Sequence, residues 1–548
     1  MKIIFYHLII LIMFFLSTHF AQSQNVVVVE PDEGINIGGL NDAINSAADP
    51  ANTIFELRRG GFYYLNGSIS HEGYTLHIRA EEGDGPRPVL QPAVDDLGAA
   101  APPIETGGSL ILEGIYIQGR DELGVYTNRQ IIITGDNNRI IFENTFHDYA
   151  RQSIVRLTTL DNYVSFNNSI IRNSLRIENP GNGRVIDTRS NPQDSLIIKN
   201  STIYNNGSAL IRIAGAFVKY IEIDHNTLWA VEFNGGIDLE TTLEAKVTNN
   251  IFQNFGYRAS SIQHDPLFWV DSLFTIGEFT DADRSFDLSN NNWYMDPAIG
   301  DIIEEFGSDT LYTFDAEDEE QLDTLFYEWE MRENIFADTE LIEDGTLLPP
   351  PILSFIENGQ VDTTNIFREK LEFDNAPPLN LEYWEFYTVN NYQIRELDPP
   401  NPWADEDPTY YGETTENPYT FNYNANSRSA TASESGGPLG APRWTTYGET
   451  SIEDQPLLPS NQVNTYPNPF TDQVTFQVFS EDHKQVRFEI FDLLGKIVMT
   501  SETPLQQGNN EITLSMDQLT ESGIYLYKVE TLNAGNNVVI ASGKFMKK

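Results

Sequence analysis

The sequence contains no cysteine and few basic residues. Without cysteine there is no disulfide framework, no thiolate metal site and no cysteine nucleophile. Only 33 lysines and arginines stand against 81 acidic residues, which gives a formal net charge of −48. Nucleic acid and anionic membrane surfaces bind through basic patches, so neither is expected as a partner. The acidity fits a solvated surface, or else a calcium-rich or salty medium.

Long apolar runs are absent after the start of the chain. Met1 to Ser23 contains Lys2, an apolar run from Ile3 to Leu16, and small residues at its end. This run is too short for a membrane anchor and no stop-transfer pattern follows, so residues 1–23 are predicted to be a secretory signal peptide. The mature chain is expected to begin at Gln24 and to have no transmembrane span.

Five segments repeat one pattern, in which alternating apolar residues are followed by asparagine. They are IIFENTF (140–146), VSFNNSI (164–170), LIIKNSTI (196–203), IEIDHNTL (221–228) and AKVTNNIF (245–252). With Asn144, Asn168, Asn200, Asn226 and Asn250 taken as equivalent, the spacings are 24, 32, 26 and 24 residues. A period in this range indicates stacked repeats, and β-branched alternation makes the repeats strands. We predict an all-β protein built on a right-handed parallel β-helix over residues 24–300, with two strands per coil.

The asparagine column is expected to be structural. A stacked asparagine at a tight turn satisfies neighbouring backbone groups through its side chain. A role of the same column in binding carbohydrate or metal is the alternative.

A second column of the repeat carries charged residues. Arg156, Arg212 and Asp238 each follow the assigned asparagine of their coil by 12 residues, and Asp187 follows Asn168 by 19 because a loop near residues 175–181 intervenes. These four residues should stack on one strand face, with Arg189 and Glu240 beside them. One interpretation is a ladder of salt bridges exposed to solvent, which stabilises little. The other is a groove for an acidic polysaccharide, in which arginine holds carboxylates.

The remaining segments of the main body are less regular. Gly39 to Ala48 is predicted to be an amphipathic helix that covers the first coil, and Phe286 to Tyr294 one more coil. Residues 301–444 form an acidic, aromatic-rich extension expected to pack on the β-helix, with a helix predicted from Glu317 to Phe336. The aromatic residues of Leu381 to Tyr387 suit buried packing, or alternatively stacking on sugars. No cofactor is identified and no metal site is assigned, although the acidic run from Asp315 to Glu320 has the oxygen ligands that Ca²⁺ takes.

The end of the chain is a separate domain. Residues 445–462 are polar with two prolines, which indicates a linker, and residues 463–548 contain alternating strands that predict a compact antiparallel β-sandwich. Several motifs follow in order: Tyr466-Pro467-Asn468-Pro469-Phe470, Phe491-Asp492-Leu493-Leu494-Gly495-Lys496, Gly523-Ile524-Tyr525 and Lys547-Lys548. This segment resembles the C-terminal sorting domain of type IX secretion substrates. The resemblance implies contact with the type IX machinery, outer-membrane translocation, and release or attachment at the cell surface.

The coils resemble the pectin-lyase-type right-handed β-helix superfamily over residues 24–300. Ile223 to Trp229 (IDHNTLW) is similar to a strand motif of some pectate lyases, and GGPLGAPRW (436–444) is similar to a closing motif of exported β-helix proteins of Bacteroidetes type. The arginine signature of pectate lyases and the catalytic motifs of polygalacturonases are missing, so no catalytic residue is carried over. The resemblance implies a surface or secreted protein that binds or degrades an extracellular polysaccharide, as a polysaccharide lyase or glycoside hydrolase if it is an enzyme. A non-catalytic adhesin or structural solenoid is the alternative.

Overall fold

The chain forms two compact units, divided between Tyr447 and Gly448. The structure is a computed structural model. In the first unit it describes residues 24–32, 37–92, 100–121, 124–177, 182–231, 237–255, 268–270, 276–306, 308–315, 318–326, 340–341, 347–348, 351–390, 400 and 419–445. In the second unit it describes residues 463–466, 470, 472–480, 484–491, 496–505, 508–516, 518–519, 523–532 and 538–547. The predicted signal peptide and nearly all of the predicted linker lie outside these residues.

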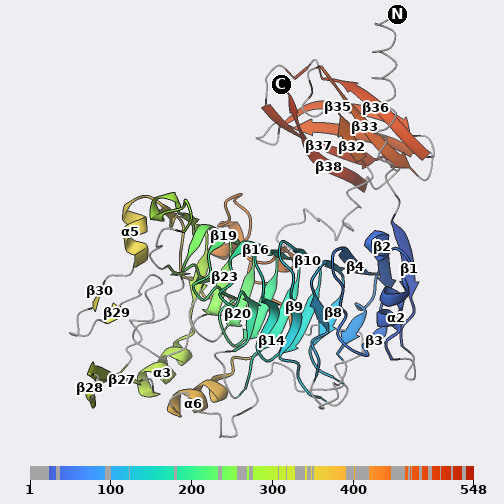
Figure 1. Ribbon diagram of the computed structural model, residues 1–548. Helices are drawn as coiled ribbons and strands as arrows, with labels where there is room; N and C mark the ends of the chain where they lie inside the picture. Colours follow the sequence, from blue (N-terminus) through green and yellow to red (C-terminus); the bar gives the residue numbers. More distant parts are fainter. Residues whose placement is uncertain are drawn as a thin grey trace, which may run out of the picture. The chain divides into compact units, whose positions relative to one another are not determined.

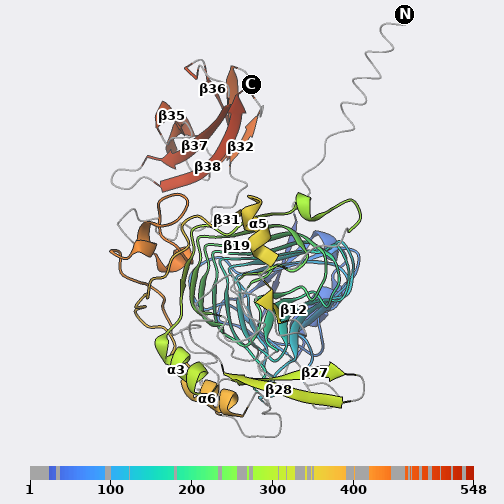
Figure 2. The same ribbon diagram turned by 90° about the vertical axis from the view of Figure 1, so that its left-hand side faces the viewer.

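The first unit is a parallel β-solenoid, as predicted, and its coils stack one behind another (Figures 1 and 2). A typical coil has three strands rather than the predicted two, and each of the three belongs to a different parallel sheet. The eleven-stranded sheet contains β1 (Asn25–Val29), β2 (Thr53–Leu57), β4 (Thr75–Ala80), β7 (Ser109–Glu113), β10 (Arg139–Glu143), β13 (Tyr163–Asn167), β16 (Gln193–Lys199), β19 (Val218–Asp224), β22 (Thr242–Thr248), β25 (Ser285–Asp287) and β31 (Val361–Asp362).

Two further sheets complete the coils. The nine-stranded sheet contains β3 (Phe62–Tyr64), β5 (Val89–Gln91), β8 (Tyr116–Gln118), β11 (Phe146–Ala150), β14 (Ile170–Ser174), β17 (Thr202–Asn206), β20 (Thr227–Val231), β23 (Ile251–Phe255) and β26 (Asn292–Tyr294). The five-stranded sheet contains β6 (Ile104–Thr106), β9 (Arg129–Ile133), β12 (Ser153–Leu157), β15 (Arg184–Asp187) and β18 (Ile211–Arg212). A separate pair, β21 (Ile237–Asp238) and β24 (Phe268–Trp269), follows β18 along the stack.

The interior of the solenoid is filled by columns of apolar side chains. Alternation along each strand points every second residue inward, and parallel register places equivalent residues on top of one another. In the eleven-stranded sheet Phe142 pairs with Phe166, and Phe166 pairs with Ile198. The rings of Phe142 and Phe166 stack with centroids 4.3 Å apart. This continuous core replaces the missing disulfides as the source of stability.

The turn between the eleven- and nine-stranded sheets contains two adjacent columns. The first has positive φ and is occupied by Gly114, Asn144, Asn168, Asn200, His225, Asn249, Asn290 and Asn365. The second points inward and is occupied by Thr145, Ser169, Ser201, Asn226, Asn250 and Asn291. The predicted equivalence was therefore wrong by one residue at two coils, because His225 and Asn249, and not Asn226 and Asn250, match Asn144.

Side-chain oxygens of the second column satisfy backbone groups from coil to coil. The backbone N–H of Ser201 donates to Asn226 Oδ1 at 2.9 Å, that of Asn226 to Asn250 Oδ1 at 2.9 Å, and that of Asn250 to Asn291 Oδ1 at 2.9 Å. All of these side chains are buried. The structural interpretation of the asparagine repeats therefore fits the inward column best.

The first coil is covered as predicted. Helix α2 (Gly39–Ser46) buries Leu40 and Ile44 in the solenoid core, so the open end of the stack does not expose its apolar interior. The predicted additional coil at Phe286 to Tyr294 is also present, as strands β25 and β26.

The extension contains short helices and strands. They are α3 (Pro297–Phe306), β27 (Ser308–Asp315), β28 (Asp318–Phe326), β29 (Glu340–Leu341), β30 (Leu347–Leu348), α5 (Pro351–Glu357) and α6 (Leu381–Val389). Helices α3 and α6 lie side by side (Figures 1 and 2). The helix predicted from Glu317 to Phe336 was wrong, because β27 and β28 form an antiparallel hairpin through Phe326. The aromatic residues Tyr383 and Trp384 of α6 are buried.

The end of the extension covers the nine-stranded sheet. Phe373 and Phe421 pack with Tyr204 and Trp229 of that sheet. The indole N–H of Trp444 donates to Thr202 Oγ1 at 2.6 Å. The outward face of this sheet is therefore occupied by the chain itself.

The second unit contains two antiparallel sheets around one core. One sheet contains β32 (Val463–Tyr466), β33 (Gln473–Ser480) and β36 (Gly508–Ser515). The other contains β34 (Lys484–Phe491), β35 (Ile497–Leu505), β37 (Gly523–Thr531) and β38 (Val538–Lys547). Phe476 and Phe488 join the two sheets, with ring centroids 4.8 Å apart, in a cluster that also contains Val529. The predicted β-sandwich is therefore present.

Candidate functional site

The predicted charged column lies on the outward face of the five-stranded sheet. Arg156 of β12 pairs in register with Asp187 of β15, and Asp187 pairs with Arg212 of β18. Asp238 follows on β21, whose strand contacts β18, and its Oδ2 accepts the backbone N–H of Ile213 at 3.0 Å. The four residues thus stack in the predicted order, and the flanking Val155 and Leu157 point into the core.

Two further arginines, which the sequence interpretation missed, belong to this face. Arg129 of β9 and Arg184 of β15 both pair in register with Ser153 of β12. On its own strand, each of them lies three residues before the residue that belongs to the charged column. This shared offset is the signal in the sequence that could have identified them. We call Arg129, Arg156, Arg184, Arg189 and Arg212, together with Asp187, the arginine face.

Among the residues that the structure describes, few negative groups balance the arginine face. Arg212 Nη1 lies 3.4 Å from Asp187 Oδ1, whose carboxylate also accepts the backbone N–H of Arg189 at 3.2 Å. Arg129 Nη2 donates to the side-chain amide oxygen of Gln152, and Arg184 Nη1 donates to that of Asn182. In the described part of this face, arginine charge therefore exceeds carboxylate charge.

Arg156 stands at the centre of the arginine face. Its side chain is half-buried, and its Nε is buried with no hydrogen-bond partner among the residues that the structure describes. Burial, and next the repulsion from Arg189, lower the pKa of Arg156. A buried guanidinium nitrogen without an acceptor is costly, so this position favours a bound anion.

The neighbouring arginines share this environment. Burial lowers the pKa of Arg184 to about 10, against the attraction of Asp187. Burial, and next the repulsion from Arg156, lower the pKa of Arg129. All three groups still carry a positive charge at neutral pH, because arginine titrates far above 7.

The predicted site residues Asp238 and Glu240 form a buried carboxylate pair beside the arginine face. Asp238 Oδ1 accepts the backbone N–H of Glu240 at 3.2 Å, and a Glu240 side-chain oxygen accepts the backbone N–H of Gly215. Burial, and next the proximity of Glu240, raise the pKa of Asp238 to about 8. The protonated form of Asp238 is thus favoured over its usual balance, and both residues also hold the neighbouring coil through its backbone.

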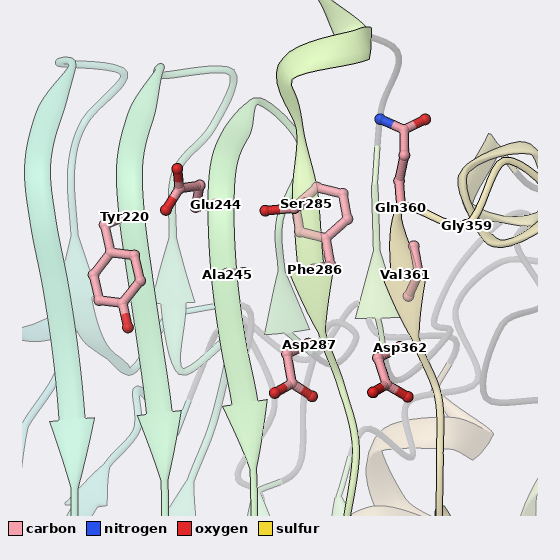
Figure 3. A pocket seen from close by; sticks show the side chains of 10 residues that line it. All are labelled: Tyr220, Glu244, Ala245, Ser285, Phe286, Asp287, Gly359, Gln360, Val361 and Asp362. Atoms are coloured by element: carbon pink, nitrogen blue, oxygen red, sulfur yellow. The ribbon is translucent and has the colours of Figure 1, made fainter. Parts of the chain in front are cut away.

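A shallow pocket of about 490 Å³ opens on the far end of the eleven-stranded sheet (Figure 3). Tyr220, Glu244, Asp287 and Asp362 are among its lining residues. Asp287 and Asp362 lie side by side on β25 and β31, and each accepts the backbone N–H of the residue two positions later. These carboxylates are already engaged in turns and would repel an anion, so this pocket differs in character from the arginine face.

Metal ligands do not cluster in the part of the chain that the structure describes, since no group of three or more His, Cys, Asp or Glu residues there is arranged to hold a metal ion. The side chains of the calcium candidate, Asp315 to Glu320, lie outside that part. In the same part, no helix is long and apolar enough to cross a membrane.

The second unit matches a known protein family. Residues 464–541 match the family described as the secretion system C-terminal sorting domain. The chain is therefore an exported protein, carried by type IX secretion to the cell surface or the medium, and its main body is a parallel β-solenoid. No curated protein matches the sequence. One solved structure, dimeric latent PorU from Porphyromonas gingivalis, is similar at 23% identity and a TM-score of 0.15; the match covers 16% of this chain and 9% of that one.

Proposed function

We propose that this exported solenoid binds an acidic polysaccharide on the arginine face. One observation carries the proposal: Arg156 Nε is buried and has no hydrogen-bond partner in the described part of the chain, and it lies among five arginines that surround the carboxylate of Asp187. Desolvation and mutual repulsion make this arrangement costly when empty, and bound anions would offset both costs. Such a concentration of positive charge stands out in a chain whose net charge is −48.

The shape of the face favours an extended ligand. The arginines are spread over consecutive coils of one sheet, so the positive charge follows the direction in which the coils stack. Polysaccharides are the extended polymers of the extracellular space to which the sorting domain directs the chain. Arginine suits their carboxylate or sulfate groups, because its planar fork donates two parallel hydrogen bonds.

The test is titration of the mature protein with a panel of acidic and neutral polysaccharides by isothermal calorimetry. Arg156→Gln should weaken binding of the acidic ligand by about tenfold or more, since a hydrogen bond to a charged group is worth about 1.5–3 kcal/mol. Arg139→Gln is the matched control, because Arg139 is exposed on the eleven-stranded sheet of the same coil and stacks on Tyr163. Equal affinities for wild type and Arg156→Gln would contradict the proposal.

Cleavage of the bound glycan is a second candidate function, favoured by the protonated carboxyl group of Asp238 beside Arg212. A carboxyl group with its pKa near the working pH suits a general acid. A hydrolase would release new reducing ends, and a lyase would release unsaturated ends that absorb ultraviolet light. In either case Asp238→Asn should abolish turnover while leaving binding in place. If wild-type protein gives neither product from any ligand that it binds, the protein is a binding module.

A further inference from the structure

The strands of the five-stranded sheet carry one arginine on each of four consecutive coils, in alternating positions, and Arg189 follows the end of β15 outside this pattern. Arg156 and Arg212 lie in the column that also holds Asp187. Arg129 and Arg184 lie in a second column, three residues earlier on their strands. Along the stack the four arginines therefore alternate from one column to the other.

The spacing of this pattern follows from the geometry of a parallel sheet. Neighbouring strands lie about 4.8 Å apart, so arginines of the same column repeat after about 9.6 Å. Three residues along a strand span about 10 Å, which separates the two columns. A chain lying between the columns would thus meet an arginine at each coil, first on one edge and then on the other.

We propose that the ligand is a linear glycan with an acidic group on every sugar, lying along the stack with successive acidic groups on opposite edges. This inference rests on the proposed function and specifies its substrate class. An extended 1→4-linked pyranose chain with two-fold screw symmetry presents the substituents of successive sugars in this alternating way. A glycan with an acid on every second sugar would instead present all of its acids on one edge and would use one column.

Acidic residues close the arginine row at both ends. Glu105 of β6 is exposed and pairs in register with Ile132, the residue of the charged column one coil before Arg156. Asp238 and Glu240 follow Arg212 on the next coil. An anionic sugar beyond the four coils would meet exposed Glu105 at one end, and at the other end the charged column continues with Asp238 in place of an arginine. The site therefore accommodates about four sugars, one for each coil of about 4.8 Å.

The experiment compares two size-matched sets of oligosaccharides by calorimetry with the mature protein. Oligomers of β-1,4-linked glucuronic acid carry an acid on every sugar, and hyaluronan oligomers carry one on every second sugar. The first set should bind about tenfold or more tightly than the second, because twice as many arginines are engaged. Affinity should rise with length up to about four sugars and then level off.

Two double variants test the columns separately. Arg129→Gln with Arg184→Gln, and Arg156→Gln with Arg212→Gln, should each weaken binding of the glucuronic acid oligomers by about tenfold or more. The corresponding Arg→Lys pairs retain the charge without the planar fork, and they replace the Gln pairs if those unfold. The inference alone is overturned if both oligomer sets bind equally, or if only the column of Arg156 and Arg212 affects affinity. The proposed function fails as well if the Arg156 and Arg212 variants bind as tightly as wild type, or if no acidic polysaccharide binds at all.

Discussion

Removing the side chain of Asn250 tests whether the inward turn column holds the coils together. Asn250 Oδ1 accepts the backbone N–H of Asn226 at 2.9 Å, and Asn250 Nδ2 donates to the carbonyl of Ile223 at 2.8 Å. Asn250→Ala therefore leaves two buried backbone groups without these partners. Each unsatisfied group costs about 1–3 kcal/mol, so the free energy of unfolding should fall by about 2–6 kcal/mol.

Tryptophan fluorescence during urea unfolding measures this loss in the right part of the molecule. All seven tryptophans precede Tyr447, so the signal reports on the solenoid unit and not on the sorting domain. Asn128→Ala is the control, because Asn128 is exposed in a solenoid loop, and it should change stability by less than about 0.5 kcal/mol. Equal unfolding midpoints for the two variants would refute the account of the column as a ladder of buried hydrogen bonds.

Three further predictions use the same protein. Arg172→Met removes the partner of the buried Asp148 carboxylate, which lies 2.7 Å away, and should cost about 3–5 kcal/mol in the fluorescence assay; a loss below about 1 kcal/mol would contradict this. Burial, and next Glu240, raise the pKa of Asp238 from 3.8 to about 8, so between these values the folded state binds a proton that the unfolded state has lost. Stability should therefore fall as pH rises through this range, and Asp238→Asn should flatten that slope; parallel pH profiles for the two proteins would be the contrary result. Deleting residues 463–548 should leave the protein in the periplasm of a host with type IX secretion, checked by immunoblotting of cell fractions, and normal surface display of the truncated protein would contradict the sorting role.

The sequence predicted the solenoid because its signals are local and repeated. Alternating apolar residues and a recurring turn residue define a coil even when the coils differ in length. The register slipped at His225 and Asn249 because each is followed by an asparagine, so two adjacent columns carry the same residue type. Periodicity alone does not separate a turn residue with positive φ from its inward neighbour.

The sequence predicted only some residues of the candidate site, because periodicity alone also fails to assign the others to a face. Arg156, Asp187 and Arg212 stand at matching positions of strands that the repeat already aligned. Arg129 and Arg184 lie where two successive inward residues, such as Ile154 and Val155, interrupt the alternation. A two-residue period places such arginines on the opposite face, whereas in the folded protein they lie on the arginine face. The hairpin of β27 and β28 escaped prediction because its acidic and apolar residues also fit a helical period.

The coil is the unit in which this molecule can change size. Because each coil contacts chiefly its two neighbours, duplication or loss of one whole coil preserves every remaining contact between coils. The row of arginines, however, would grow or shrink by one step of about 4.8 Å at each such event. Related proteins that differ by one coil would then bind stretches of polyanion of different length. Duplication or loss of a coil in the gene would thus change the length of the bound ligand, while the contacts between the remaining coils stay the same.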